Sequence, residues 1–382
     1  MSGKKLLYPR TWIEVDARAA RENIRTFRNV LGRGPELWAV VKSNAYGHGL
    51  YAFSALAEKL GVDGFCVDSI IEAVRLRESG IKKFILVLGP TSPDSFGDAV
   101  ARDITLSVAT GNELKFLARM KSPPFYHLKV DTGMNRRGFF VRDAVVSIRF
   151  IAQNEKLASS FRGLYTHFAS AKDVNYPTYT DFQLEQLLSV RDFAKKRGLK
   201  GFTTHAAASG GTLIKKRYHC DAVRVGIGLY GLWPSKELEV QRDDLALFPV
   251  LSWRTFIAEV KTAEAGSYIG YDLTERLRRR TKLAVLPVGY WHGFSRSLSG
   301  PVGEVLVRGK RAPVLGRVSM DLVVVDVTGI GCDVGDRVTL IGRDGKEEIK
   351  APEVAGRAGT IHYEFLTRLN PLIERRITGS GS

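Results

Sequence analysis

The feature that most constrains the fold is an alternation of apolar segments and helical patterns between residues 38 and 228. Eight short apolar runs are typical of strands buried in a parallel sheet. They lie at 38–42, 64–68, 84–88, 104–108, 125–131, 161–167, 202–206 and 222–228. Helical patterns fall between most of them, at 50–60, 69–79, 94–102, 111–120, 142–154 and 180–197. Eight strands alternating with helices predict an α/β fold, a (β/α)8 TIM-type barrel.

A doubly wound open sheet is the competing interpretation of this alternation. Such a sheet places its ligand at a single switch point in the strand order. Here candidate polar residues follow many different strands: Lys42, Arg136, His167, Ser209 and Arg224. Only a closed sheet gathers all of them at one place, which favours the barrel.

The sequence pattern changes near Pro249, where longer alternating segments begin. Strands are predicted at 250–260, 283–289, 303–308, 312–318, 322–328 and 337–342, with a short helix near 352–357. We therefore predict a barrel over 16–245 and a mostly β domain over 246–377. The strand at 11–15 is expected to join the second domain, and 378–382 to form a flexible tail.

The composition fits a globular enzyme, with 44% apolar and 25% charged residues. The net charge of +17 is spread along the chain, so we interpret it as a solvated basic surface rather than a nucleic-acid site. No apolar run is long enough for a membrane span, and the N-terminus lacks the apolar core of a signal peptide. Three widely spaced cysteines predict no metal site and favour a reducing, cytoplasmic location.

The segment 38–49 contains a lysine, Lys42, at the end of the first predicted barrel strand. Lys42 directly follows the apolar run, and turn-forming and glycine residues come after it. An amine at the mouth of a buried strand is expected to be poorly hydrated, which lowers its pKa. A neutral amine can condense with an aldehyde.

The segment Val41-Lys-Ser-Asn-Ala-Tyr-Gly-His-Gly49 resembles the pyridoxal-phosphate lysine motif of alanine racemases, and similar matches recur along nearly the whole chain. The resemblance implies that Lys42 forms a Schiff base with pyridoxal 5'-phosphate. It also implies that Tyr46 contacts the phosphate of this cofactor.

Glycine-rich segments follow the seventh and eighth predicted strands, where barrels usually bind phosphate. The family resemblance points to Ser209, Gly226, Ile227 and Tyr363 as phosphate contacts. The asparagine that is usual before the serine is Ala208 here, which removes one polar side chain.

Arg224 lies in a segment, 221–232, that resembles the racemase segment whose arginine contacts the pyridine nitrogen. An arginine stays protonated and can only donate a hydrogen bond. The ring nitrogen would then stay unprotonated and withdraw electrons weakly, which favours returning a proton to the α-carbon over transamination.

Racemisation needs a proton donor or acceptor on each face of the α-carbon. Lys42 can serve one face, and Tyr268, in a segment (266–271) similar to the catalytic tyrosine segment of the family, can serve the other. A phenol with a pKa near 10 needs help at neutral pH. His167 resembles the histidine that hydrogen-bonds this tyrosine, so we predict a relay of Arg224, His167 and Tyr268.

Three further matches concern the substrate. The resemblance places Arg136 near the substrate carboxylate and the phenolic oxygen of the cofactor. Lys129 matches a lysine that is carbamylated in many family members, and here plain lysine and carbamate both stay open. Met320 and Tyr290 resemble a carboxylate-binding residue and an entrance residue, which suggests alanine as substrate, with serine next.

The predicted function is therefore interconversion of L- and D-alanine, supplying D-alanine for peptidoglycan. The family implies a homodimer in which Tyr268 enters from the neighbouring subunit. Three alternatives stay open: a serine or broad-specificity racemase, an amino-acid decarboxylase of the same fold type, and a non-catalytic cofactor carrier. A decarboxylase typically has an acid in place of Arg224, and a carrier lacks the β domain.

Overall fold

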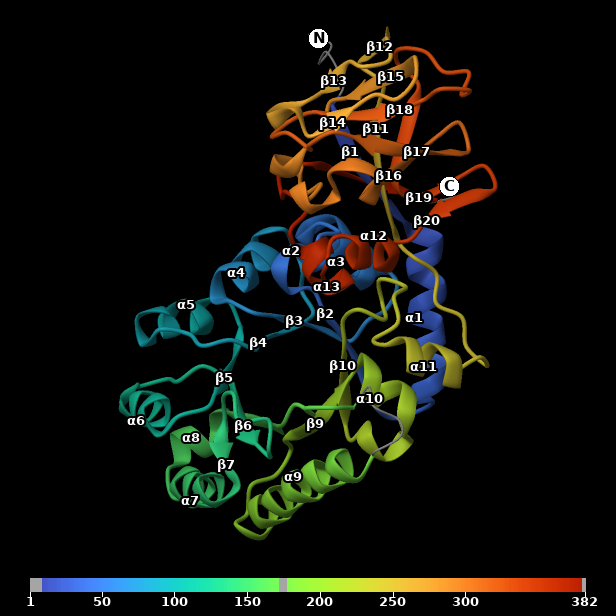
Figure 1. Ribbon diagram of the computed structural model, residues 1–382. Coiled ribbons are helices and arrows are strands. Elements are labelled where there is room, and N and C mark those ends of the chain that lie inside the picture. Colours follow the sequence, from blue (N-terminus) through green and yellow to red (C-terminus); the bar gives the residue numbers. More distant parts are fainter. Residues whose placement is uncertain (1–8, 172–176, 380–382) are drawn as a thin grey trace. The chain divides into compact units, whose positions relative to one another are not determined.

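The computed structural model describes residues 9–171 and 177–379, and Figure 1 shows the elements of the chain in sequence order. The chain divides into two compact units. The first comprises Ala19–Ala45 and Phe53–Phe248, and the second the described residues of Met1–Arg18, Tyr46–Ala52 and Pro249–Ser382. The stretch that follows Lys42 thus groups with the second unit, although it lies inside the barrel sequence. Residues 380–382 of the predicted tail lie outside the described residues.

The first unit contains a closed parallel barrel (Figure 1). Its eight strands, counted in the described part of the chain, are β2 (Glu36–Val40), β3 (Gly64–Val67), β4 (Phe84–Val87), β5 (Thr105–Val108), β6 (Tyr126–Asp131), β8 (Phe161–Tyr165), β9 (Thr203–Ala208) and β10 (Ala222–Val225). Each pairs in parallel with the next, and β10 pairs with β2 to close the ring. The barrel prediction is confirmed. The doubly wound alternative is wrong, because an open sheet would leave two strand edges unpaired.

Two helices of this unit begin with capping boxes. Ser69 and Glu72 form a capping box at α4 (Ile70–Glu78), and Thr110 and Glu113 form one at α6 (Gly111–Arg119). Both glutamates also hold segments near the predicted site. Further helices are α1 (Ala17–Leu31), α3 (Leu50–Lys59), α5 (Phe96–Ala101), α7 (Val141–Ala152), α8 (Glu155–Ser160), α9 (Thr178–Lys196), α10 (Ser209–Ile214) and α11 (Lys236–Gln241). The short strand β7 (Phe139–Phe140) pairs in parallel with the end of β6.

The second unit is built mainly on a mostly antiparallel sheet with the strand order β12-β15-β18-β17-β16-β19-β11-β1-β21, in which β1 and β21 pair in parallel. Its strands are β1 (Thr11–Asp16), β11 (Leu251–Phe256), β12 (Glu259–Ala263), β15 (Thr281–Leu286), β16 (Glu304–Val307), β17 (Lys310–Leu315), β18 (Val323–Asp326), β19 (Arg337–Asp344), β20 (Glu347–Ile349) and β21 (Glu374–Thr378). A separate pair, β13 (Tyr268–Ile269) and β14 (Glu275–Arg276), carries Tyr268. β1 pairs with β11 and with β21, so the N-terminal strand belongs to this sheet.

Two short helices complete the second unit. The helix predicted near 352–357 is α12 (Ala351–Arg357), with Pro352 in its first turn. The helix α13 (His362–Thr367) follows it and carries Tyr363; the sequence analysis did not predict it. Among the helices of the described part, none combines the length and the apolar content that a bilayer crossing requires.

Candidate active site

Lys42 lies two residues beyond the end of β2, whose residues Leu37 to Val40 are buried. The Nζ atom of Lys42 lies 3.5 Å from Oδ1 of Asp68, which follows β3. The Lys42 side chain is 37% exposed. Lys42 thus lies just beyond the buried part of the strand, and the poor hydration of its amine stays a prediction.

The backbone after Lys42 turns with the left-handed conformation. Ser43, Asn44, Ala45 and Tyr46 have φ angles of 54°, 57°, 52° and 51°, in the segment labelled α2 (Lys42–Tyr46). For residues other than glycine this conformation costs about 1–2 kcal/mol each. Such strain persists only where surrounding contacts enforce it, and it gathers at functional sites.

Glu72 supplies one of these contacts within the first unit. Its carboxylate accepts a hydrogen bond from the backbone N–H of Ser43 at 2.6 Å and another from that of Asp68 at 2.9 Å. The carboxylate that caps α4 thus also fixes the backbone on either side of the Lys42–Asp68 ion pair. Glu72 was not among the predicted site residues, although the capping-box spacing after β3 was a usable signal.

Arg224, on β10, is the centre of a buried polar cluster and is only 2% exposed. Its Nη2 donates to the carbonyls of Thr166 and Ala206 at 2.8 and 2.9 Å, and its Nη1 lies 2.5 Å from Nδ1 of His205. Nη2 also lies 3.3 Å from Nδ1 of His167. The structure therefore brings together the arginine and the histidine of the predicted relay.

The electrostatics define how these two side chains interact. Burial, with Arg224 as the next cause, lowers the pKa of His167 to about 3, so its imidazole is neutral near pH 7. A neutral ring that accepts from Arg224 at Nδ1 carries its hydrogen on Nε2. His167 can therefore donate one hydrogen bond from Nε2 while Arg224 fixes its tautomer.

A second histidine pair extends the cluster, and the sequence analysis did not identify it. Nε2 of His205 lies 2.7 Å from Nδ1 of His127, and His205 stacks on Tyr165 with ring centroids 4.6 Å apart. Burial lowers the pKa of His127 to about 3 and that of His205 well below its usual value. Both rings are therefore neutral and can hold the Arg224 side chain without repelling its charge.

Gly163 makes room for His127. A Cβ atom at position 163 would lie 2.2 Å from Nδ1 of His127, which is far inside van der Waals contact. We expect Gly163→Ala to displace this ring and to lower the free energy of unfolding by about 1–3 kcal/mol, as overpacked cores do. Urea unfolding measures this loss.

Gly97→Ala is the matched control for that measurement. Gly97 lies in α5, and no atom lies within 4 Å of the Cβ position there. The control should be neutral or slightly stabilising, because alanine favours helices. Equal stability of the Gly163→Ala and wild-type proteins would contradict the packing of His127 against β8.

Lys129 lies on β6 within this cluster, 8% exposed, with its ammonium 5.7 Å from the centre of the Tyr165 ring. Burial, followed by the charges of Arg136 and Arg137, lowers the pKa of Lys129 to about 8. A lowered pKa increases the fraction of neutral amine, which is the form that a carbamate requires. The surroundings of Lys129 thus favour carbamylation.

Arg136 and Arg137 face different partners. Asp131 accepts hydrogen bonds from the backbone N–H groups of Gly133, Asn135 and Arg136, which shapes the turn that presents Arg136. Arg137 pairs with Glu113 at 2.8 Å and donates to two backbone carbonyls. The unusual arginine at 137 is therefore held by the fold.

Ser209 and Gly226, two of the predicted phosphate contacts, lie together. Oγ of Ser209 accepts hydrogen bonds from the backbone N–H groups of Gly226 and Gly228, both at 3.2 Å. Ile227 lies between these two glycines and is buried. The hydroxyl hydrogen of Ser209 is left to donate to another acceptor.

The remaining phosphate candidates, Tyr46 and Tyr363, lie together in the second unit. Their ring centroids are 6.3 Å apart. Burial raises the pKa of Tyr363, with a smaller contribution from Tyr46, so the phenol stays protonated and can donate.

Tyr268, Tyr290 and Met320 are exposed on the second unit. The guanidinium of Arg276 lies 5.6 Å from the centre of the Tyr268 ring. The backbone N–H of Tyr290 donates to the carbonyl of Ser319 at 3.1 Å, so the segments of Tyr290 and Met320 are neighbours.

Comparison with known proteins identifies the family of this chain. The family model for the alanine racemase N-terminal domain matches residues 15–234, and that for the C-terminal domain matches residues 250–377. An alanine racemase of Leptospira interrogans is 36% identical over 373 residues, covering 96% of this chain and 95% of that protein. The chain belongs to the alanine racemase family.

Solved structures of the alanine racemase family share its fold. The alanine racemase of Bacillus anthracis with bound L-Ala-P superposes with a TM-score of 0.89 at 35% identity, covering 98% of this chain and 97% of that one. An alanine racemase of Clostridium difficile gives a TM-score of 0.91 at 30% identity, with the same coverage.

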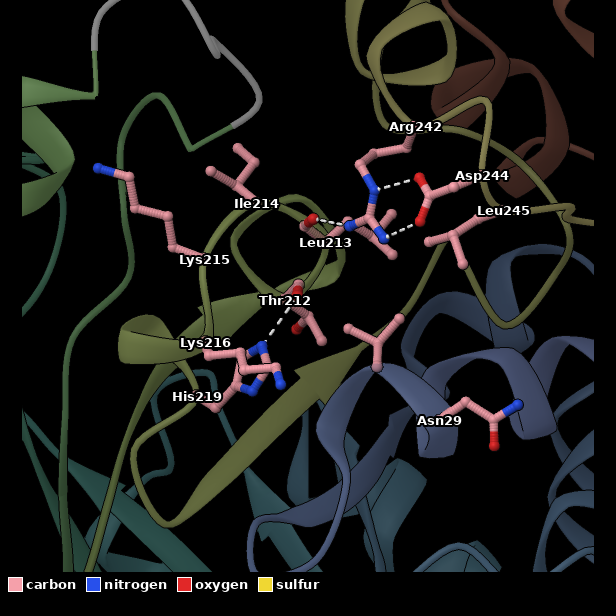
Figure 2. Close-up of a pocket in the computed structure, with 11 residues that line it drawn as sticks. Asn29, Thr212, Leu213, Ile214, Lys215, Lys216, His219, Arg242, Asp244 and Leu245 are labelled. Carbon is pink, nitrogen blue, oxygen red and sulfur yellow. Dashed lines mark hydrogen bonds and ion pairs between the residues drawn. The ribbon is translucent and has the colours of Figure 1, made fainter.

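Apart from the predicted site residues, the first unit has a cavity of about 380 Å³, shown in Figure 2. Arg242 in its wall pairs with Asp244 and donates to the carbonyl of Leu213, and Nε2 of His219 lies 2.9 Å from the carbonyl of Thr212 (Figure 2). None of the predicted site residues lines this cavity. We therefore do not assign it to the reaction.

Proposed function

We propose that this chain interconverts L-alanine and D-alanine with pyridoxal phosphate bound through Lys42. The observation that carries the proposal is the surroundings of Arg224. This buried arginine is fixed by two carbonyls and two neutral histidines, and it can only donate hydrogen bonds. Placed at the pyridine nitrogen, Arg224 withholds a proton from the ring and so favours proton return over transamination.

The residues of the chain fit this cofactor. A phosphate needs several donors, and the Ser209 hydroxyl, backbone N–H groups near Gly226 and Ile227, and the hydroxyls of Tyr46 and Tyr363 are of that kind. When bound, pyridoxal phosphate supplies an aldehyde that condenses with amines and a ring that withdraws electrons from the α-carbon.

We assign the two proton transfers to Lys42 and Tyr268. The Lys42 amine serves one face of the α-carbon, and the Tyr268 hydroxyl serves the other. His167, neutral and oriented by Arg224, donates from Nε2 toward the Tyr268 oxygen and stabilises its charge when the phenol gives up its proton. Arg136 and the backbone of Met320 bind the substrate carboxylate, and Tyr290 limits the substrate side chain to a small one.

The competing functions lack a supporting observation. An amino-acid decarboxylase of this fold would need an acid where Arg224 lies in its ring of carbonyls and histidines. A carrier protein would not need the second unit, whose longest segment is Pro249–Ser382. A serine or broad-specificity racemase would keep the same machinery, and the relative rates with L-serine decide between them.

The assembly and the cellular role are further parts of the proposal. Tyr268, Tyr290, Trp291 and Met320 are exposed side chains on the second unit, which is what a surface covered by a partner subunit would present. We propose a homodimer in which each Tyr268 serves the Lys42 of the other subunit. We also propose a cytoplasmic location and a role in supplying D-alanine for peptidoglycan.

The test is a racemisation assay on purified protein with added pyridoxal phosphate. We expect L-alanine to lose its optical rotation completely, and borohydride to fix the cofactor covalently to a peptide containing Lys42. Formation of an amine with release of carbon dioxide would indicate a decarboxylase instead. Binding of the cofactor without any turnover of L-alanine would contradict the proposed function.

A further inference from the structure

Two glycines after Lys42 lie against the C-terminal part of the second unit. Gly47 and Gly49 have φ angles of +84° and +97°. A Cβ atom at Gly47 would lie 2.1 Å from the carbonyl oxygen of Leu366, and one at Gly49 would lie 3.0 Å from Cγ of Arg375. The missing side chain at Gly47 therefore lets the backbone of this stretch approach the carbonyl of Leu366, and the one at Gly49 leaves room for the Arg375 side chain.

Arg375, on β21, joins two segments that are far apart in sequence. Its Nε and Nη2 donate to the carbonyl of Gly47 at 3.1 and 3.0 Å. Its Nη1 donates to the carbonyls of Asn370, at 2.8 Å, and Ile373, and its Nη2 also donates to that of Leu369 at 3.4 Å. The guanidinium thus links the stretch after Lys42 to the chain after α13.

The charge of Arg375 has no carboxylate partner within ion-pairing distance in the described ranges, and its acceptors there are backbone carbonyls. Burial lowers the pKa of Arg375 to about 10, so the side chain still carries its charge at neutral pH. Carbonyls satisfy hydrogen bonds but bring no negative charge. An uncompensated cation in a partly buried place stabilises an anion nearby.

Both segments that Arg375 holds lead to a predicted phosphate contact. Gly47 directly follows Tyr46, the last of four residues in the strained left-handed turn. Leu369 and Asn370 follow α13, which carries Tyr363. The two tyrosine rings lie 6.3 Å apart, so one side chain fixes the backbone on both sides of this pair.

We propose that Arg375 is a positioning residue for the cofactor phosphate. It holds in place the backbone segments that carry Tyr46 and Tyr363, and it adds positive charge to their surroundings. This inference rests on the proposed function, because it takes the two tyrosines as phosphate ligands. It predicts that Arg375 contributes to affinity for the phosphorylated cofactor and not for the same aldehyde without phosphate.

The test compares equilibrium binding of pyridoxal phosphate and of pyridoxal to the full-length protein, followed by the absorbance of the bound aldehyde. We expect Arg375→Met to weaken pyridoxal phosphate binding about tenfold to a hundredfold, the range for losing charged hydrogen bonds. Pyridoxal binding should change by less than about threefold. Arg375→Lys keeps the charge but not the fork of donors, and should show a smaller loss of the same selectivity.

Arg376→Met is the matched control, because Arg376 is the next residue on β21 and pairs with Glu374. It should leave both affinities unchanged. An equal loss of both affinities in the Arg375 variants would overturn the inference and assign Arg375 to general folding. Unchanged affinities for pyridoxal phosphate and pyridoxal would also overturn the inference. If Arg375→Met does not fold, Arg375→Lys is used instead, and its loss of affinity for pyridoxal phosphate is compared with its loss of affinity for pyridoxal. Failure of the wild-type protein to bind pyridoxal phosphate at Lys42 would refute the proposed function itself.

Discussion

Replacing Lys42 with alanine is expected to lower racemase activity by at least about 10⁴-fold, the scale seen when a covalent catalytic group is removed. Lys42 has two roles in the proposal, since it binds the cofactor covalently and moves a proton at the α-carbon. Its loss should also abolish borohydride labelling of the protein. The activity and the label are measured on the same preparation.

Lys200→Ala is a suitable control, because Lys200 is an exposed lysine of the same unit. This variant should keep both full activity and the label. Borohydride labelling that persists in Lys42→Ala would show that another amine holds the cofactor, and would contradict the assignment of Lys42.

Replacing Tyr268 with phenylalanine is expected to lower racemisation in both directions by about 10²- to 10⁴-fold, the usual contribution of a general acid or base. The change removes only the hydroxyl, and the exposed position of Tyr268 predicts little effect on folding. Cofactor binding should be unaffected, because the proposal gives Tyr268 no contact with the phosphate. Initial rates from L-alanine and from D-alanine measure the effect.

Tyr271→Phe provides the comparison, since Tyr271 is an exposed tyrosine three residues further along. It should retain wild-type rates. Undiminished turnover by Tyr268→Phe from both enantiomers would eliminate the tyrosine as a base and leave Lys42 as a single base.

The barrel could be predicted because its strands are buried on both faces and follow one another at regular intervals. The prediction of a single strand at 250–260 was less accurate. Two strands occupy this range, because β11 ends at Phe256 and β12 begins at Glu259. Between them, Ile257 and Ala258 donate to Asp336 and Val285, which lie on different neighbouring segments. A change of partner within one apolar run leaves no signal in the sequence.

Residues of the candidate site were predictable where the required chemistry determines the residue type. They were less predictable where contacts between distant parts of the chain determine the conformation. Lys42 and Arg224 follow from motif resemblance and donor chemistry. The left-handed turn from Ser43 to Tyr46 does not, because its residues rarely adopt that conformation and contacts from distant parts of the chain enforce it. The pair of histidines next to Arg224 was hidden for a similar reason, since His127 on β6 and His205 on β9 meet only when both strands pair with β8.

The most direct test of the central claim is to mix the inactive Lys42→Ala and Tyr268→Phe proteins and let their subunits exchange. If Lys42 of one subunit works with Tyr268 of its partner, each mixed dimer contains one intact site and one doubly altered site. Random pairing should then restore about a quarter of wild-type activity. A mixture that exchanges subunits but stays inactive would contradict an active site shared between subunits.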